Sequence, residues 1–539
     1  MTASAASPHI GGSAPNTPAP PTTIPWLGLA AVLMGAFIST LNGRLSSFGL
    51  ADIRGAVGAG FDEGAWITTA QTVAQMFVTL LAVWMGAAYG ARRVLIWTSL
   101  LFAIVSLLTP FCETLPTFLA MQFLGGLASG FFIPLTLSFV LLNMPPKFWA
   151  FGIAVYALNL ELSLNISASL EGWYTEHHSW RWIFWQNVPL ALIMTLCLHR
   201  GITNKPITTK PPSDIYALLA GGAGLALIYA ALDQGNRLDW LNSGLVCSLL
   251  VGGAVLLVAF FVHEARTPSP LINLKVVFGS PMPSQFLLIA FLRLTVFATS
   301  YLIPLYLGAV RGYRALEVGD TLIWIAMPQL IFCPLAALML RRSDPRLVAA
   351  IGFIFISVAC LMVAYNLTPI WGSTQFLPSA LLQALGQSFA LSGVIFFGIL
   401  HLQLKDALTF GAVLQTARLM GGEVGSAFIT TLTRIREQVA SNLIGQHLQS
   451  GDSKVLQRLG AYGSATTRAI DVAGAAQRGQ LVLGNVVRAA ATTQSVMDGF
   501  VAVGFLSAIA LLIVVFRNAA PEGPASAMPL FPTRRSGSR

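Results

Sequence analysis

The sequence predicts an all-helical polytopic membrane protein, and three observations support this fold class. Of the 539 residues, 55% are hydrophobic and 10% are charged, whereas an average soluble protein is about 25% charged. A soluble domain of this size cannot cover its surface with so little charge. The apolar runs recur along almost the whole chain and are continuous rather than alternating, which predicts spanning helices and not a β-barrel. An ordinary soluble enzyme, a disordered chain and a singly anchored protein are excluded.

Fourteen segments are apolar enough to cross a bilayer, because a spanning helix needs about 20 mainly apolar residues. The expected spans are 26–50, 65–85, 94–111, 118–142, 149–170, 182–198, 215–232, 245–262, 286–310, 321–340, 347–365, 376–400, 408–432 and 500–516.

Charge in the loops predicts the orientation of these spans. Alternate loops carry most of the short-loop lysines and arginines, while the other set carries few of them and many acids. The basic set is Arg92, Arg93, Lys147, Arg200, Lys205, Lys210, Arg266, Lys275, Arg341, Arg342, Arg346 and Lys405. Because cytoplasmic loops are enriched in Lys and Arg, both termini are expected in the cytoplasm, with the protein in the inner membrane.

Two polar segments interrupt the regular succession of spans and set the expected domains. A Pro-rich linker follows the sixth span, and a long Ala/Gln/Arg-rich segment precedes the last one. That second segment is expected to form one or two amphipathic outer helices, with a solvated loop as the alternative. The predicted organisation is a disordered cytoplasmic tail (1–24), an N-terminal six-helix bundle (25–202), a cytoplasmic linker (203–214), two extra spanning helices (215–265), the first five helices of a C-terminal bundle (266–433), an extracytoplasmic helical segment (434–498), the last span (499–517) and a disordered cytoplasmic tail (518–539).

Several local motifs accompany this 6+2+6 arrangement. They are the first-span segment 41–53, Glu63-Gly-Ala-Trp66, Ile133-Pro134-Leu135 with Pro145-Pro146, Trp180-Arg181-Trp182-Ile183-Phe184-Trp185-Gln186-Asn187-Val188-Pro189, Leu232-Asp233-Gln234-Gly235 with Asp239-Trp240, the segment 264–272, and Arg418 with Gly421, Gly422 and Gly425. Together they resemble the major facilitator superfamily, specifically its fourteen-span drug:proton antiporter branch (EmrB/QacA type, DHA2). The resemblance implies two six-helix bundles plus two extra central helices, and export of organic compounds in exchange for protons.

The chain departs from that family pattern at four places. Asn42 stands where the family has an acid in the first span, with Arg44 two residues later. Gln122 replaces the fourth-span arginine, and Ser167-Ala168 replaces the Gly-Pro pair of the fifth span. The motif after the second span is reduced to Gly86, Gly90, Arg92 and Arg93, without its acid. The resemblance therefore implies the fold, but it does not identify the residues that carry protons.

Glu161 and Glu423 are the candidate proton-coupling residues. A charge at the bilayer centre costs roughly 2.5–3.5 kcal/mol, so such residues face the bundle interior. Glu161 lies near the middle of the fifth span, and a structural ion pair with Arg44 or Arg418 is the alternative. Glu423 follows Arg418 by five positions, which places the two about 140° apart on a helix. We therefore expect them to face different ways.

The remaining intramembrane polar residues are candidates for a substrate cavity, and small residues are candidates for helix crossings and conformational change. For Arg44 the alternative is snorkelling to the interface, and for the glutamines it is hydrogen bonding between helices. The cavity candidates are Asn42, Arg44, Gln71, Gln75, Gln122, Tyr156, Asn159, Asn165, Arg293, Gln415 and Arg418. The conformational candidates are Gly86, Gly90, Arg92, Arg93, Gly126, Gly130, Pro134, Gly421, Gly422 and Gly425.

The sequence predicts a secondary transporter rather than an enzyme. It has no phosphate-binding loop, no hydrolase motif, and no metal-ligand spacing among its cysteines and histidines, so no cofactor or metal is expected. Its net charge of +10 lies in loops and sets topology, so no nucleic-acid partner is expected.

Three functions remain open. The first is proton-coupled export of small amphipathic organic compounds by alternating access. The second is a uniporter, or an importer of an organic anion drawn by Arg44, Arg293 and Arg418. The third is a non-transporting receptor or scaffold. The expected partners are the substrate, protons and membrane lipids, with a periplasmic membrane-fusion adaptor and an outer-membrane channel for residues 434–498.

Overall fold

All regular structure in the described part of the chain is helical. The computed structural model describes residues 25–202, 214–268, 270–272, 274–279, 281–402, 406–449 and 472–518, with a few single positions between 450 and 471. Most of the predicted tails and linker lies outside the described residues, namely 1–24, 203–213 and 519–539.

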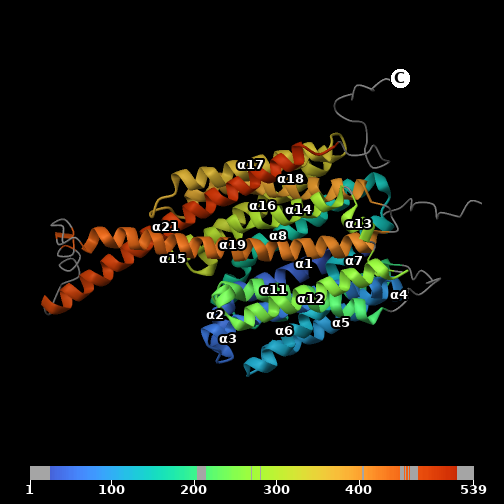
Figure 1. The fold of residues 1–539 in the computed structure, drawn as a ribbon, viewed down its shortest axis with the longest axis horizontal. Helices are drawn as coiled ribbons and strands as arrows, with labels where there is room; N and C mark the ends of the chain where they lie inside the picture. The colour runs from blue at the N-terminus through green and yellow to red at the C-terminus, as the bar shows by residue number, and fades with distance from the viewer. Residues whose placement is uncertain are drawn as a thin grey trace, which may run out of the picture.

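Helices α1 to α10 form a first bundle, α11 and α12 form a central pair, and α14 to α21 form a second bundle (Figure 1). The first bundle contains α1 (Trp26–Phe48), α2 (Leu50–Ala56), α3 (Phe61–Gly64), α4 (Trp66–Tyr89), α5 (Ala91–Leu108), α6 (Leu115–Ser129), α7 (Phe132–Asn143), α8 (Trp149–His177), α9 (Trp182–Trp185) and α10 (Asn187–Gly201). The central pair is α11 (Ile215–Gly235) and α12 (Gly244–Arg266), followed by α13 (Leu274–Phe278). The second bundle contains α14 (Met282–Phe297), α15 (Ile303–Arg311), α16 (Ala315–Leu340), α17 (Pro345–Asn366), α18 (Leu377–Leu400), α19 (Ala407–Gln449) and α21 (Val472–Val515).

The predicted membrane fold is confirmed. Thirteen helices among the described residues are long and apolar enough to cross a membrane. Helix α19, which contains the predicted span 408–432, runs beside them (Figure 1). Its hydropathy is lower because it carries Gln415, Arg418 and Glu423 in its apolar stretch.

Small residues allow the helices of each bundle to cross closely. A Cβ atom at Gly126 of α6 would lie 2.1 Å from the carbonyl oxygen of Gln71 on α4. A Cβ atom at Gly421 of α19 would lie 2.4 Å from the Cα of Ala290 on α14. Since real Cβ contacts are never this short, only glycine fits at either crossing.

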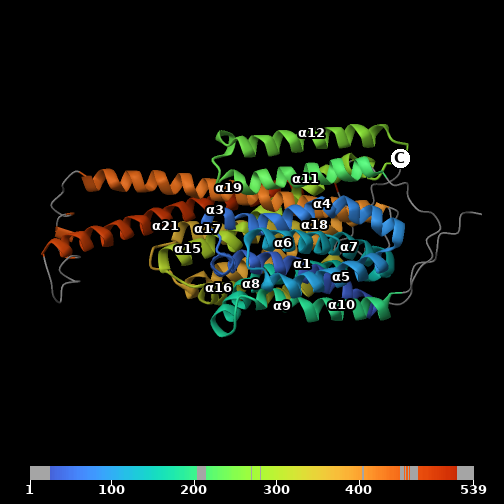
Figure 2. The ribbon, with the colours of Figure 1, turned by 90° about the horizontal axis from the view of Figure 1, so that it is seen from below.

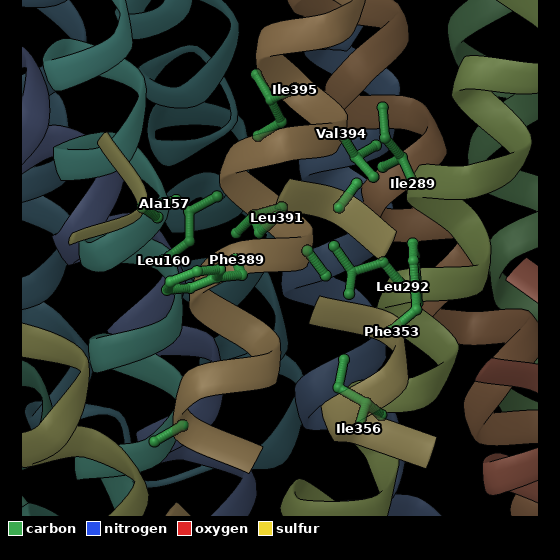
Figure 3. Close-up of a cluster of buried hydrophobic side chains, with 14 of the residues drawn as sticks. Ala157, Leu160, Ile289, Leu292, Phe353, Ile356, Phe389, Leu391, Val394 and Ile395 are labelled. Carbon is green, nitrogen blue, oxygen red and sulfur yellow. The ribbon is translucent and has the colours of Figure 1, made fainter. Parts of the chain in front are cut away.

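The two bundles meet along two lines of contact. At one, Gly172 of α8 lies against the backbone of Leu316 on α16. At the other, the Ser138 hydroxyl on α7 donates to the Ala407 carbonyl of α19 (3.1 Å). Buried apolar side chains fill the space between α8, α14, α17 and α18, as Figure 3 shows for Leu160 and Phe389. The bundles therefore contact each other both through α8 and α16 and through α7 and α19.

The central pair packs on the outside of the bundles with α12 outermost (Figure 2). The Ala217 N–H donates to the Asp214 carboxylate at the start of α11 (3.0 Å), and this bond holds the pKa of that carboxyl below its usual value. His263 of α12 contacts the same carboxylate (2.5 Å). At its other end α11 contacts α19 through Asn236 and Thr431 (3.2 Å). Helix α11 thus lies against both α4 and α19.

Helices α19 and α21 continue well past the rest of the molecule (Figures 1 and 2). The described parts of the segment predicted at 434–498 are helical, and they prolong the two spans without a break. The residues after Arg434 are mostly good helix formers, with no proline to end the helix. Arg436 of α19 pairs with Asp498 of α21 (2.6 Å) where the two helices leave the bundle.

Candidate functional site

A polar cavity of about 220 Å³ lies between the bundles, in the half of the protein where α1 ends and α4 begins. Helices α1, α4, α8, α11, α14 and α19 contribute to its wall. Its polar and charged lining is Ser39, Thr40, Arg44, Ser47, Thr68, Thr72, Gln75, Tyr229, Asp233, Arg293, Ser300, Arg418, Glu423 and Ser426. Six predicted site residues therefore come together here, namely Arg44, Gln75, Arg293, Arg418, Gly422 and Glu423.

Arg418 and Glu423 lie about 140° apart on α19, as expected, and both nevertheless line this cavity. Between them on the helical wheel lie Gly422, Ser426 and Leu419, which also line it. The cavity therefore follows an arc of about 140° around α19. Gly422 has no side chain, and this leaves the space that joins the two sides of the arc.

Three guanidinium groups form a cationic cluster on one side of the cavity. Arg293 lies close enough to both Arg44 and Arg418 for their charges to interact. Arg44 donates to the Ser300 carbonyl (3.0 Å). This carbonyl is available because Pro304, four residues later, has no N–H to donate to it. The Arg418 Nε donates to the Gln415 side chain (3.0 Å). Arg44 therefore reaches into the protein rather than snorkelling to the interface.

Glu161 is fully buried beside this cluster, and its partner is Arg293 (3.4 Å). The expected alternative partners, Arg44 and Arg418, form no ion pair with it. Helix α14 brings Arg293 to Glu161 from a position 132 residues away in sequence. Tyr156, five residues before Glu161 on α8, is also buried and lies near Arg293 and Arg418.

Two carboxylates form an acidic cluster on the other side of the cavity. The Tyr229 hydroxyl donates to Glu423, and Asp233 lies close enough to Glu423 for their charges to interact. Asp233 accepts hydrogen bonds from Thr69 and from the Gln234 side chain. Sequence reasoning misses Asp233 as a site residue because the predicted seventh span ends at residue 232, and it misses Tyr229 although that residue lies within the span. The family-like motif that contains Asp233 was the signal.

A buried amide network links the bundles next to Glu161. Asn165 donates to the Glu161 backbone carbonyl (2.9 Å) and to the Gln387 side chain (3.4 Å). Gln329 also donates to Gln387 (3.1 Å), which itself donates to Thr299 (3.1 Å). Apart from Glu161, only Asn165 in this network is a site residue predicted from the sequence.

Other predicted cavity residues lie elsewhere. Asn42 accepts a hydrogen bond from Asn187 (2.7 Å), which joins α1 to α10. Gln71 and Gln122 are buried on α4 and α6, the two helices that cross at Gly126. Asn159 is half-buried on α8 and is not part of the cavity lining. None of these four residues lines the central cavity.

The opposite end of the interface is closed. A Cβ atom at Gly411 of α19 would lie 2.5 Å from the Pro134 carbonyl oxygen of α7, and Gly86 packs against Leu135 and Leu408. The motif that follows Gly86 lies at this end.

In that motif, Gly90 ends α4 at a positive φ of 83°. The Arg92 side chain donates to the His199 carbonyl (2.9 Å), while Arg93 is exposed.

The cavity continues toward the end from which α19 and α21 project. A second cavity of about 440 Å³ shares Thr68, Asp233, Glu423 and Ser426 with it. Arg237 and Arg434 line this second cavity, which we call the vestibule. The protein thus has a central cavity that is closed at one end and continuous with a vestibule at the other.

Comparisons with known proteins agree with this arrangement. The sequence profile of the Major Facilitator Superfamily matches residues 32–426. The chain is 26% identical to "Probable multidrug resistance protein EmrY" of Escherichia coli, over 79% of this chain and 83% of that protein. It is 25% identical to "Puromycin resistance protein pur8" of Streptomyces alboniger, over 76% and 82%.

Solved structures show the same fold. The human organic anion transporter MFSD10 (TETRAN) superimposes with a TM-score of 0.55 at 15% identity, covering 91% of this chain and 99% of that one. The proton:xylose symporter XylE gives a TM-score of 0.56 at 11% identity, covering 94% and 97%.

Proposed function

Because the chain belongs to the major facilitator superfamily, we propose that it exports small amphipathic organic compounds in exchange for protons. The protein is a membrane transporter and not an enzyme. The observation that carries the proposal is the central cavity, lined by charges of both signs at the interface of two bundles. Charged residues inside a membrane protein are costly and are retained for substrate or ion pathways. The relatives named for resistance to drugs and to fatty acids support an organic substrate.

The closed and continuous ends of the cavity support alternating access. Transport of this kind needs the bundles to rock about a central site, so that the contact between α7 and α19 opens as the vestibule closes. Glycines at both bundle contacts let backbones slide past one another without side chains in the way.

Glu423 is the proton carrier that the site favours. Two carboxylates placed close together in a low-dielectric site favour one shared proton, and Glu423 has Asp233 beside it. Glu161 remains a candidate, but it takes part only if it leaves Arg293. Binding of a substrate beside Glu423 would release the shared proton, which couples the two fluxes.

The proposed location is the inner membrane, with both termini in the cytoplasm. The excess of Lys and Arg in one set of loops supports this orientation. The vestibule then opens to the extracytoplasmic side. An alkaline phosphatase fusion after residue 518 is expected to be inactive, and an active fusion would reverse the orientation.

Proteoliposomes with an imposed pH gradient test the proposed function. We expect a panel of amphipathic anions, cations and zwitterions to contain compounds whose accumulation follows the gradient and stops when an ionophore removes it. Flux that ignores the gradient would instead support an organic-anion uniporter, which the cluster of Arg44, Arg293 and Arg418 favours. Binding without flux would leave a receptor or scaffold.

We also propose that the extensions of α19 and α21 contact a periplasmic membrane-fusion adaptor, which leads to an outer-membrane channel. The projection of two long helices beyond the bundle supports this proposal (Figure 2). Replacing residues 437–497 with a Gly/Ser linker keeps Arg436 and Asp498 and should abolish co-purification of an adaptor. Transport in proteoliposomes should persist, and unchanged co-purification would contradict the proposal.

A further inference from the structure

We propose that the substrate of the central cavity is a zwitterion, with its acidic group bound by Arg44 and Arg418 and its basic group bound by Glu423 and Asp233. This inference rests on the proposed transport function and names the substrate class of the same site.

The cationic side of the cavity carries an excess of positive charge. It holds three guanidinium groups and one neighbouring carboxylate, Glu161, which is used by Arg293. Arg44 donates to a backbone carbonyl and Arg418 to an amide, both neutral acceptors, and the Arg44 Nε has no partner. A carboxylate or phosphate on the ligand would supply the charge-assisted hydrogen bonds that these two arginines lack.

The acidic side of the central cavity holds no cation of its own, and Arg237 and Arg434 near it belong to the vestibule. The groups that face Glu423 and Asp233 from α4 and α11 are Thr69, Tyr229 and Gln234, all neutral. Arg237 approaches Asp233 from the vestibule but pairs with Asp62 (2.9 Å). An ammonium group on the ligand would therefore be the counter-charge of the two carboxylates.

The two sides do not neutralise each other. Among the described residues, no ion pair joins Arg44, Arg293 or Arg418 to Glu423 or Asp233. Arg293 interacts with the two other arginines, and Asp233 interacts with Glu423, so each side concentrates charge of one sign. A ligand with a single charge meets repulsion from one side, whereas a zwitterion satisfies both, and this difference gives selectivity.

Three matched compounds measure the contribution of each charge. Ciprofloxacin carries a carboxylate and a piperazinium, its methyl ester keeps the cation, and its N-acetyl derivative keeps the anion. We expect the purified full-length protein at neutral pH to bind the zwitterion roughly 10- to 100-fold more tightly than either derivative, in equilibrium dialysis without a gradient. A smaller set, 4-(aminomethyl)benzoate with its methyl ester and N-acetyl derivative, tests the same point in less space.

Two variants assign each charge to one side of the cavity. Arg418→Gln should bind the zwitterion and the ester equally, but should still prefer the zwitterion to the N-acetyl compound. Glu423→Gln should bind the zwitterion and the N-acetyl compound equally, but should still prefer the zwitterion to the ester. Arg341→Gln and Glu113→Gln are matched controls, since both residues are exposed and lie outside the cavity. If Arg418→Gln does not fold, Arg44→Gln takes its place.

Equal binding of all three compounds in both sets overturns the inference, as does the absence of zwitterion binding in both. Loss of both preferences in each variant overturns it too. Because binding is measured without a gradient, loss of proton exchange in proteoliposomes contradicts the proposed function while leaving this result intact. Conversely, proton-driven flux of all three compounds at similar affinity overturns the inference of a zwitterionic substrate and leaves the proposed transport function intact.

Discussion

Replacing Glu161 with glutamine is expected to destabilise the protein by about 3–5 kcal/mol, because it leaves the buried Arg293 without its counter-charge. Arg293 would then lie next to two further arginines, Arg44 and Arg418, with no carboxylate on that side of the cavity. Folded proteins have a total stability of only about 5–15 kcal/mol, so this variant should lose a large fraction of its stability. Size-exclusion chromatography and thermal unfolding in detergent give the measurement.

The reverse substitution, Arg293→Gln, is expected to be milder. A carboxyl group that loses its partner can become neutral by binding a proton, whereas a guanidinium stays charged at any accessible pH. The removal of one of three adjacent cations also relieves repulsion. Equal loss of stability in both variants would show that the pair is held by packing rather than by charge.

The double variant Glu161→Leu/Arg293→Leu separates stability from function. Buried ion pairs replaced by apolar residues of similar volume are often neutral or stabilising. We therefore expect the double variant to fold. Recovery of transport would make the pair structural, while a folded but inactive protein would make it part of the mechanism.

Sequence reasoning identified the membrane fold because hydropathy is a local property of each segment. The burial of Glu161 followed in the same way, since a charge in the middle of an apolar run has to face the interior. The identity of its partner, Arg293, could not be predicted from the sequence, because the pairing depends on how α8 and α14 lie against each other. The choice among Arg44, Arg293 and Arg418 is a tertiary one that no spacing along the chain encodes.

The acidic side of the cavity shows a second limit. Asp233 stands at the end of an apolar run, where a charge usually marks the start of a loop, yet α11 continues to Gly235.

The geometry of α19 shows a third limit. A helical wheel gives the direction of Arg418 and of Glu423, but it does not give the width of the cavity beside the helix. Helix direction alone therefore separates two residues that one cavity joins.

The substitution Glu423→Gln is expected to uncouple transport from protons. Glutamine keeps the size of the side chain and a hydrogen bond to the Tyr229 hydroxyl, but it removes the group that shares a proton with Asp233. In proteoliposomes, the ratio of uptake with and without a pH gradient should fall to about one, since the coupling free energy between proton and substrate vanishes. Substrate exchange at equal pH on the two sides should continue at a higher substrate concentration, because Glu423 also binds the substrate but alternating access does not itself need the carboxylate.

Three further variants make this result specific to the acidic side of the cavity. Asp233→Asn should weaken coupling as well, since the shared proton needs both carboxylates. The exposed Glu113→Gln should leave coupling unchanged. The double variant Glu161→Leu/Arg293→Leu decides between the two candidate carriers. Full gradient dependence in Glu423→Gln, together with its loss in a folded Glu161→Leu/Arg293→Leu protein, would transfer the role to Glu161. The opposite pattern places the proton where α11 meets α19, and gives the extra helix pair a part in coupling rather than in packing alone.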